Sequence, residues 1–376
     1  MSSFDKVIDR TNTSSTKWDR YSGRDILPFW VADMDFEAPD FILQAVRERL
    51  AHGVLGYTQP PQALNDGFLA WLKRTYLWSV DQSSLVWLPG VVPGLNLAAR
   101  ALAKPGGSIL LPAPVYHPFL GLSKNSGQRA QCVPLVRDSS SGQWVMDFDA
   151  LEHYVDDTTT MIAICNPQNP TGRVYTRQEL TELADFCVRH DLVVLSDEIH
   201  CELILDRESR HIPIASLNPE IANRSITLYA ATKTYNIAGL SCAVAVIPNP
   251  AIRRRFEAAD SGLLSGIGPL SFAASQAAYL DTSPWLERLL TYLRNNHAAV
   301  LKAAGSRMNP VQATYLAWID VSDLRLTNPA SYFEEHGLGL SLGAQFGQDG
   351  HIRLNFGCPI SLLEAGLARL ERALEH

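Results

Sequence analysis

The sequence has no excess of positive charge and no long apolar run. Its 376 residues carry 32 Lys and Arg against 39 Asp and Glu, which gives a formal net charge of −7 at pH 7. An acidic chain is not attracted to nucleic acid or to an anionic membrane, so neither is expected as its main partner. The longest apolar candidate, residues 263–280, is interrupted by Gly266, Pro269 and Gln276, so no membrane span is predicted.

The sequence also lacks closely spaced cysteines. Six cysteines are scattered along the chain and none forms a CxxC pair. Their mostly apolar neighbours predict buried free thiols of a reduced compartment rather than disulfides or a zinc site. The histidines are not paired with carboxylates at ligand spacing, so no metal site is expected. The polar first twenty residues contain no apolar signal segment, which predicts a cytoplasmic location.

What is present is an ordinary globular composition, with 46% hydrophobic and 19% charged residues. The length is sufficient for two or more domains. From about residue 84, short apolar runs alternate with helical patterns, which predicts an α/β fold with a mostly parallel sheet covered on both faces. Strands are expected at 84–88, 108–111, 130–136, 160–165, 192–196 and 226–230, and helices at 93–103, 116–125 and 177–189.

The pattern changes after about residue 283. A long helix over 284–304 is followed by strand-like residues 313–321, by residues 331–336 and 352–356, and by a final helix over 361–374. This order predicts a smaller α+β unit, against which the first forty residues are expected to pack. We therefore expect a large domain over residues 46–282 and a small domain formed by residues 1–45 and 283–376.

Three polar clusters each follow a predicted strand. Asn169 lies in the sequence NPQNPTG, where two prolines and Gly172 hold the turn rigid. Asp197 ends a buried strand, and Lys233 lies in a loop of small residues after the next strand. Ligands of parallel sheets bind beyond the carboxyl ends of the strands, so these three side chains are expected to meet.

A lysine, a carboxylate and an amide at successive strand ends are what pyridoxal 5'-phosphate (PLP) chemistry requires. The lysine forms a Schiff base with the aldehyde, and the carboxylate keeps the pyridine nitrogen protonated so that the ring draws electrons. Each feature alone has an ordinary interpretation, namely a surface lysine, a helix cap and a common turn. Their joint occurrence in this order favours the cofactor site.

The sequence resembles the fold type I PLP enzymes of the aminotransferase class I/II superfamily over nearly its whole length. The most specific segments are NPQNPTG, SDEIH, ATKTYNIAGL and IRLNFGCP. The resemblance implies a large domain with a mostly parallel seven-stranded sheet. It also implies that Lys233 forms the Schiff base, Asp197 pairs with the pyridine nitrogen, Asn169 contacts the ring oxygen and the substrate, and Arg353 binds the substrate carboxylate. A guanidinium fits that last role because its planar fork matches a carboxylate.

Further residues are assigned by the same resemblance. Val91 and Val92, at the start of a predicted helix, and Thr232 are expected to bind the phosphate, where helix N–H groups favour an anion. Tyr116 matches an aromatic residue that stacks on the cofactor ring, and it is counted with Lys233 among the candidate catalytic residues. Tyr57 matches a tyrosine that reaches the phosphate and substrate of the neighbouring subunit, which implies a homodimer. His200 is included among the candidate cofactor-binding residues, although a structural role is the alternative.

One departure from the pattern of many aminotransferases indicates a narrower group within the superfamily. Many aminotransferases carry an arginine eight residues after the lysine, but here that position is Ser241. This feature, together with the segments KWD (residues 17–19) and FWVADMDF (residues 29–36), resembles the MalY/PatB group of cystathionine β-lyases. Without the resemblance, the second segment would be interpreted as an ordinary apolar stretch with solvated aspartates.

The expected reaction is β-elimination from an S-substituted L-cysteine such as L-cystathionine. It would release a thiol (homocysteine, and hence a link to methionine biosynthesis), pyruvate and ammonia. The first alternative is an aminotransferase, which uses the same residues but requires a 2-oxo acid. The second alternative is a PLP-binding regulatory protein that acts through a protein partner, although no docking motif is visible.

Overall fold

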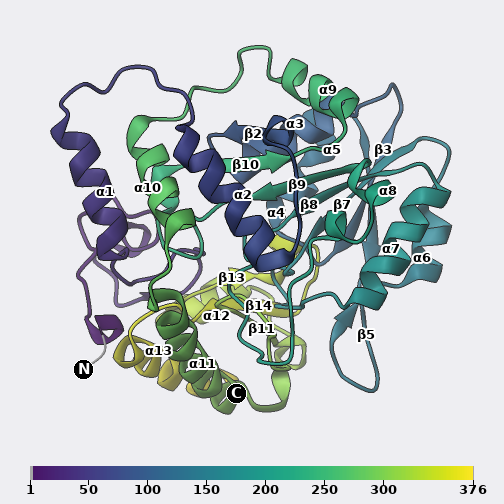
Figure 1. Cartoon of the computed structure of the whole chain (residues 1–376). Coiled ribbons are helices and arrows are strands. Elements are labelled where there is room, and N and C mark those ends of the chain that lie inside the picture. The colour runs from purple at the N-terminus through teal and green to yellow at the C-terminus, as the bar shows by residue number, and fades with distance from the viewer. Residues whose placement is uncertain (1–2, 376) are drawn as a thin grey trace.

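A seven-stranded sheet forms the centre of the molecule (Figure 1), in a computed structural model that describes residues 3–375. The strand order is β2-β10-β9-β8-β7-β3-β4. The strands are β2 (Leu85–Leu88), β3 (Ser108–Ala113), β4 (Arg129–Pro134), β7 (Thr159–Cys165), β8 (Val193–Asp197), β9 (Ser225–Tyr229) and β10 (Ala243–Val246). Within this sheet, β10 pairs antiparallel with β2 and β9, and the other pairings are parallel. The expected α/β fold with a mostly parallel sheet is confirmed, whereas β10 was not predicted.

Helices cover both faces of this sheet because its strands are apolar on both sides. Consecutive residues of a strand point to opposite faces. Ile109 accordingly packs in one core with Leu95 of α3 (Val91–Ala101), whereas Leu110 packs in another with Leu183 of α7 (Arg177–Arg189). Helices α5 (Leu122–Ser126) and α9 (Pro250–Asp260) lie beside α3, and α6 (Phe148–Tyr154) and α8 (Pro219–Ala222) contribute to the α7 side.

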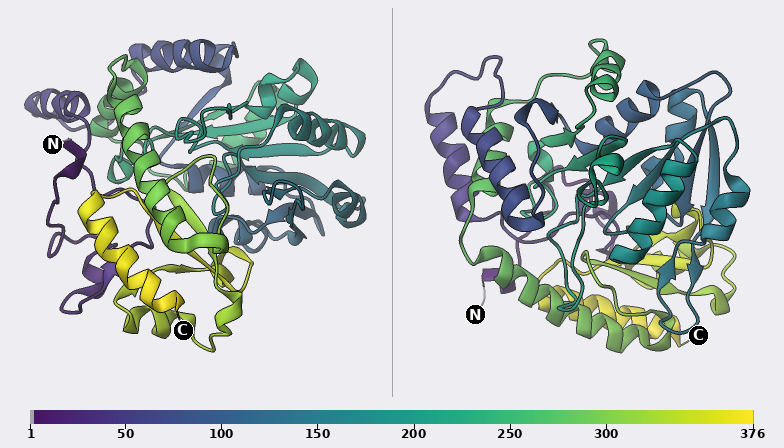
Figure 2. Two further views of the ribbon diagram at one scale, coloured as in Figure 1. Left: turned by 90° about the horizontal axis from the view of Figure 1, so that it is seen from below. Right: turned by 45° about the vertical axis from the view of Figure 1, so that its right-hand side comes forward.

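The carboxyl-terminal part forms a separate layer below the sheet in Figure 1. Its antiparallel sheet has the order β11-β14-β13, formed by β11 (Leu316–Asp320), β14 (His351–Asn355) and β13 (Ser341–Leu342). Helices α11 (Trp285–Ala304) and α13 (Ile360–Leu374) lie side by side along it, as the left view of Figure 2 shows. Residues 331–336 belong mostly to the short helix α12 (Pro329–Glu335).

The amino-terminal segment is joined to this carboxyl-terminal part. Strand β1 (Leu27–Pro28) pairs parallel with β12 (Leu338–Gly339), and Asp25 forms an ion pair with Arg369 at 2.7 Å. Helix α1 (Asp40–Ala51) packs instead on α10 (Pro269–Leu280), as does α2 (Gln62–Tyr76). The expected boundary between residues 45 and 46 falls inside α1, and the division into two domains stays a prediction.

Several element ends differ from the sequence-based expectation. Helix α3 begins at Val91 rather than at residue 93, and β3 extends to Ala113 rather than to residue 111. The helix expected over 116–125 is divided at Gly121 into α4 (His117–Leu120) and α5. The strand expected over 130–136 ends at Pro134, and a hairpin of β5 (Val136–Arg137) and β6 (Trp144–Val145) follows.

The six cysteines are free thiols, and five of them are buried. Cys132 is exposed on the edge strand β4, which corrects the expectation that all six are buried. Over residues 3–375, no helix is long and apolar enough to span a bilayer. In the same residues, no group of three or more His, Cys, Asp or Glu side chains is arranged to hold a metal ion.

Candidate active site

The predicted site residues of the large sheet lie at the carboxyl ends of its parallel strands. Tyr116 follows β3, Asn169 follows β7, Asp197 is the last residue of β8, and Lys233 lies four residues after β9. The charges of Asp197 and Arg353 act on both Tyr116 and Lys233, and Arg353 also bonds to Asn169, so these side chains lie together. The topology thus brings residues that are far apart in the sequence to one edge.

Arg353 reaches this edge from the carboxyl-terminal sheet. It is buried on β14, and its Nη1 donates to Oδ1 of Asn169 at 2.9 Å. Its Nη2 donates to the carbonyl oxygen of Trp30 at 2.8 Å and to Oγ of Ser341 at 3.3 Å, and the guanidinium lies 4.7 Å from the ring centre of Phe346. The Nε–H is buried without a partner, and burial lowers the pKa of Arg353 to about 10. An anion is the ligand that would satisfy this group.

The loop that carries Asn169 is rigid for identifiable reasons. Oε1 of Gln168 accepts hydrogen bonds from N of Thr171 (3.0 Å) and from its hydroxyl (2.8 Å). Gly172 has a φ of +70°, and its carbonyl oxygen accepts from the backbone of Gln312 and Ala313. A Cβ at Gly172 would overlap Val311 and lie 3.0 Å from the Ala313 carbonyl oxygen. The loop is therefore clamped between β7 and the carboxyl-terminal part.

Lys233 is directed toward the amino-terminal segment. Its Nζ donates to the carbonyl oxygen of Ala32 at 2.6 Å. Burial of the amine lowers the pKa of Lys233 to about 8, while the negative charges of Asp33 and Asp197 oppose that shift. An amine with a pKa this close to neutrality is unprotonated in a substantial fraction of molecules, as a nucleophile or base requires.

Asp197 and His200 are both buried beside this lysine. Burial, with a smaller contribution from Glu198, raises the pKa of Asp197 to about 7, and its Oδ1 accepts from N of Ile199 at 3.1 Å. Burial and the charge of Lys233 lower the pKa of His200 to about 3, so its ring is neutral. The Nδ1 of His200 is buried without a hydrogen-bond partner. A buried carboxylate of this kind is stabilised by a cationic ligand.

The other predicted residues of the edge lie where the sequence placed them. Tyr116 caps α4 and is half-buried, and burial raises the pKa of its phenol. Thr232 is buried. Val91 and Val92 form the first turn of α3, which has no side-chain cap, so their N–H groups can bind an anion.

Tyr57 is not brought to this edge within one chain. Its side chain is fully exposed in the loop between α1 and α2. Ser241, which stands where many aminotransferases carry an arginine, is also exposed.

Sequence reasoning missed several contacts supplied by the amino-terminal segment. The carbonyl oxygens of Trp30 and Ala32 contact Arg353 and Lys233, and Tyr315 donates to Ala32 at 2.9 Å. Main-chain groups leave no trace in residue identity, so no residue type could have indicated them. The segment FWVADMDF was the available signal, but it was interpreted only as a group signature.

The alternative interpretation of this segment, with solvated aspartates, does not hold for Asp35. Asp35 is buried, and its carboxylate accepts from Lys17 at 2.6 Å, Arg10 at 2.6 Å and Trp18 Nε1 at 2.8 Å. Lys17 is buried as well. Three donors around one carboxylate fix the segment, because a buried charge is tolerated only when it is paired.

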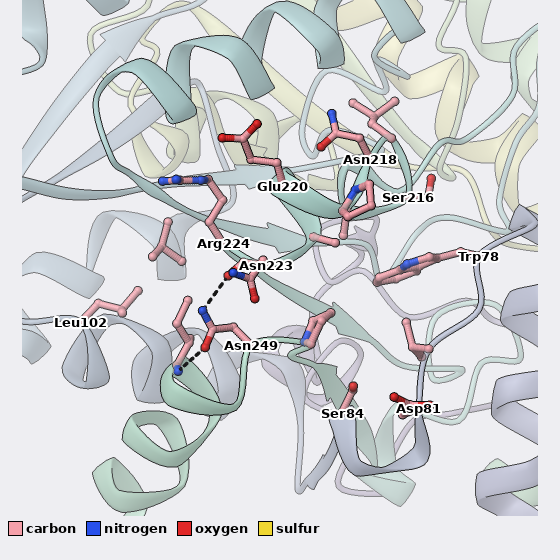
Figure 3. Close-up of a pocket in the computed structure, with 18 of the residues that line it drawn as sticks. Trp78, Asp81, Ser84, Leu102, Ser216, Asn218, Glu220, Asn223, Arg224 and Asn249 are labelled. Carbon is pink, nitrogen blue, oxygen red and sulfur yellow. Dashed lines mark hydrogen bonds between the residues drawn. The ribbon is translucent and has the colours of Figure 1, made fainter.

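A large cavity of about 1300 Å³ lies at the opposite side of the sheet, beyond the amino ends of its parallel strands. Figure 3 shows its polar lining, in which Asn249 caps α9 and also bonds to the carbonyl oxygen of Asn223. Arg224 forms an ion pair with Asp191 there at 3.0 Å. None of the predicted site residues lines this cavity, so its size is no guide to the chemistry.

The fold and this carboxyl-edge site define a PLP-dependent transferase-like protein. A sequence model of the family described as aminotransferase class I and II matches residues 24–370. The chain belongs to this family.

Comparisons with individual proteins extend over the whole chain. The chain is 36% identical to cystathionine beta-lyase PatB of Bacillus subtilis, over 99% of each chain. Among solved structures, it superposes on OvoB with a TM-score of 0.95 and 42% identity, over 99% of this chain and 98% of that one. It superposes on the PLP-bound C-S lyase of Staphylococcus hominis with a TM-score of 0.92 and 30% identity, over 100% and 99% of the two chains.

Proposed function

We propose that this protein is a PLP-dependent C–S β-lyase that acts on S-substituted L-cysteines, with L-cystathionine as the leading substrate. The observation that carries the proposal is the meeting of Lys233, Asp197, Asn169 and Arg353 at one buried edge. Full-length similarity to a cystathionine beta-lyase selects this activity within the family. The products would be a thiol (homocysteine from cystathionine), pyruvate and ammonia.

The residues present fit PLP. The raised pKa of buried Asp197 suits a protonated ring nitrogen, because that cation would offset the cost of burying the carboxylate. The uncapped first turn of α3, with Val91 and Val92, suits the phosphate, as does the hydroxyl of Thr232. His200 would contact the cofactor through its unpaired Nδ1. Tyr116 would lie against the ring, and Lys233 would bond to its aldehyde.

When bound, PLP accepts electrons from the substrate Cα, which makes the Cα proton acidic. Arg353 binds and orients the substrate carboxylate through its unsatisfied donor. The amine of Lys233 takes the Cα proton, which its lowered pKa permits near neutral pH. Tyr116 stays a protonated phenol because burial raises its pKa, so it can donate a hydrogen bond at the site. Asn169 accepts a hydrogen bond from the guanidinium of Arg353 and would contact the ring when the cofactor is bound.

The deciding experiment mixes the purified yellow protein with L-cystathionine in the absence of any 2-oxo acid. Sustained release of pyruvate and free thiol in equal amounts is expected of a β-lyase. No product would contradict the proposal, provided that the protein retains its bound cofactor by absorbance.

An aminotransferase is the second candidate, because the family includes both activities and the same four residues serve both. The residues close to the substrate Cβ decide between elimination and transamination, and these four residues do not separate the two reactions. Turnover that requires a 2-oxo acid, together with conversion of the cofactor to its amine form by an amino acid, would establish this alternative.

We also propose a cytoplasmic homodimer. Val54, Leu55 and Tyr57 are exposed on the loop between α1 and α2, and Leu263 is exposed on the connection between α9 and α10. Both loops protrude at the top of Figure 1. Exposed apolar side chains gathered on projecting loops favour a protein interface, and Tyr57 would complete the partner's phosphate and substrate site. Sedimentation equilibrium should give twice the chain mass of 41.5 kDa.

A further inference from the structure

One carboxylate oxygen of Asp33 has no hydrogen-bond partner although it is buried. This oxygen is Oδ1, whereas Oδ2 accepts from Nη2 of Arg10 at 2.5 Å. A buried carboxylate oxygen without a donor carries a desolvation cost that a protein normally avoids. The unpaired oxygen therefore requires an explanation beyond the ion pair with Arg10.

The backbone around Asp33 is fixed against the loop that carries Lys233. On one side, the carbonyl oxygen of Ala32 accepts from Lys233 Nζ at 2.6 Å. On the other side, Asn236 accepts from N of Met34 at 2.9 Å and donates to the carbonyl oxygens of Met34 (2.9 Å) and Phe36 (2.7 Å). The carbonyl oxygen of Asp33 itself accepts from Asn355 at 2.7 Å. These bonds fix the backbone on both sides of Asp33 against the loop that carries Lys233 and Asn236. The ion pair with Arg10 holds the side chain itself.

The charge of Asp33 contributes to the pKa of Lys233, and its backbone is next to the Ala32 carbonyl oxygen that accepts from Nζ. After burial, which lowers the pKa of this lysine, Asp33 is the largest influence, and it raises the pKa. Asp197 raises it as well, and Arg353 lowers it. The charged groups that influence the amine from the packed elements are thus Asp33 from the amino-terminal segment, Asp197 from β8 and Arg353 from β14. The neutral His200 is close by, and Tyr315 shares the acceptor Ala32 with Lys233.

We propose that Asp33 is a positioning residue for Lys233, whose fixed and unpaired carboxylate oxygen stabilises the lysine while it holds a proton. Arg10 supports this role by fixing Oδ2 and leaving Oδ1 free. The inference rests on the proposed function, because it concerns the lysine that takes the Cα proton. It assigns to Asp33, the first of the two aspartates in the segment FWVADMDF, the role of setting the base strength of Lys233. This role is separate from contacts to the cofactor or the substrate.

The chemistry follows from the proton balance of the elimination. Lys233 takes one proton from Cα and becomes an ammonium, which must persist until the proton passes to the leaving sulfur. A nearby carboxylate favours this charged form, and partly buried charges interact more strongly than fully exposed ones. Loss of Asp33 would make Lys233 a weaker base and would lower the rate of proton abstraction.

The test measures the amine itself in protein from which the cofactor has been removed. Wild type and Asp33→Asn are labelled with trinitrobenzenesulfonate, which reacts with unprotonated amines, across pH 5.5 to 10. Labelling of the Lys233 peptide is then quantified by mass spectrometry. We expect the midpoint for Lys233 in Asp33→Asn to fall by about one pH unit, so that labelling well below the midpoint rises about tenfold. In the loaded enzyme, kcat should fall several-fold with little change in KM.

Glu37→Gln is the matched control, since it removes a carboxylate from the same stretch of chain. Glu37 is exposed and pairs with Lys6, so the Lys233 midpoint should not move. An unchanged or raised midpoint in Asp33→Asn would overturn the inference. If Asp33→Asn does not fold, Asp33→Ser is used with the same criterion. Full turnover by Lys233→Ala would instead overturn the proposed function, so the two failures are distinguishable.

Discussion

At the scale of single residues, the site depends on charged groups whose properties are set by burial. Lys233, Asp197 and Arg353 each have a pKa moved toward neutrality, chiefly because the charged form is desolvated. Perturbed groups of this kind cluster at functional sites. Their roles can be separated by substitutions that change one charge or one hydrogen-bond geometry at a time.

Lys233→Ala should abolish the visible absorbance of the cofactor bond and reduce turnover to background, because no other amine replaces it at the strand end. Absorbance spectra and pyruvate release would measure both effects. Lys124→Ala, an exposed lysine of α5, is the control and should behave as wild type. Retention of either property in Lys233→Ala would contradict the assignment.

Arg353→Lys should raise KM about 10- to 100-fold, because an ammonium cannot reproduce the planar fork that binds a carboxylate. Its effect on cofactor absorbance should be small, since the predicted contact is to substrate. Steady-state kinetics with L-cystathionine would measure the change. A KM within twofold of wild type would remove Arg353 from substrate binding.

At the scale of elements, short loops between strands and the carboxyl-terminal layer position the site. Gly172 is packed tightly against Val311 of the carboxyl-terminal part, and its left-handed φ of +70° adds a second constraint. The strands themselves could be predicted from apolar runs, and so could the loops that follow them. Strand β10 was not predicted, although its four apolar residues are followed by the turn residues Pro248, Asn249 and Pro250.

Gly172→Ala should lower the free energy of unfolding by roughly 2–4 kcal/mol, from the left-handed φ and from overlap with Val311. Gly106→Ala is the matched control, since Gly106 has a φ of +71° but no atom within 4 Å of an added Cβ. The free energy of unfolding of Gly106→Ala should fall by only about 1 kcal/mol. Urea unfolding would compare them, and equal losses would show that packing against Val311 is unimportant.

At the scale of the whole molecule, residues from both ends of the chain complete the site. The sequence indicated the sheet, the carboxyl edge and the residues at it, because each has a local pattern. It did not indicate that the carbonyl oxygen of Ala32, next to Asp33, accepts a hydrogen bond from Lys233. That contact joins residues 201 positions apart, and only the packing of the amino-terminal segment on β14 and the lysine loop creates it.

The stability of the cofactor-free protein should depend on pH through Asp197. Its pKa is raised from 3.8 to about 7, so between these values the folded protein keeps a proton that the unfolded chain releases. The contribution is therefore favourable at low pH and is lost as pH rises toward 7. Urea unfolding at pH 5 and pH 7.5 should show this loss relative to Asp197→Asn. A pH dependence identical in the two proteins would contradict the shifted pKa.

The packing of the amino-terminal segment on β14 also fixes an order of events during synthesis. Asn355 donates to the carbonyl oxygens of Val31 (2.6 Å) and Asp33 (2.7 Å), across separations of 324 and 322 residues. Chains are made from the amino terminus, and domains fold as their residues emerge. The segment that contacts Lys233 must therefore wait without its bonds to Asn355 and Arg353 until β14 leaves the ribosome, so a nascent chain lacking its last thirty residues holds a sheet but an incomplete site.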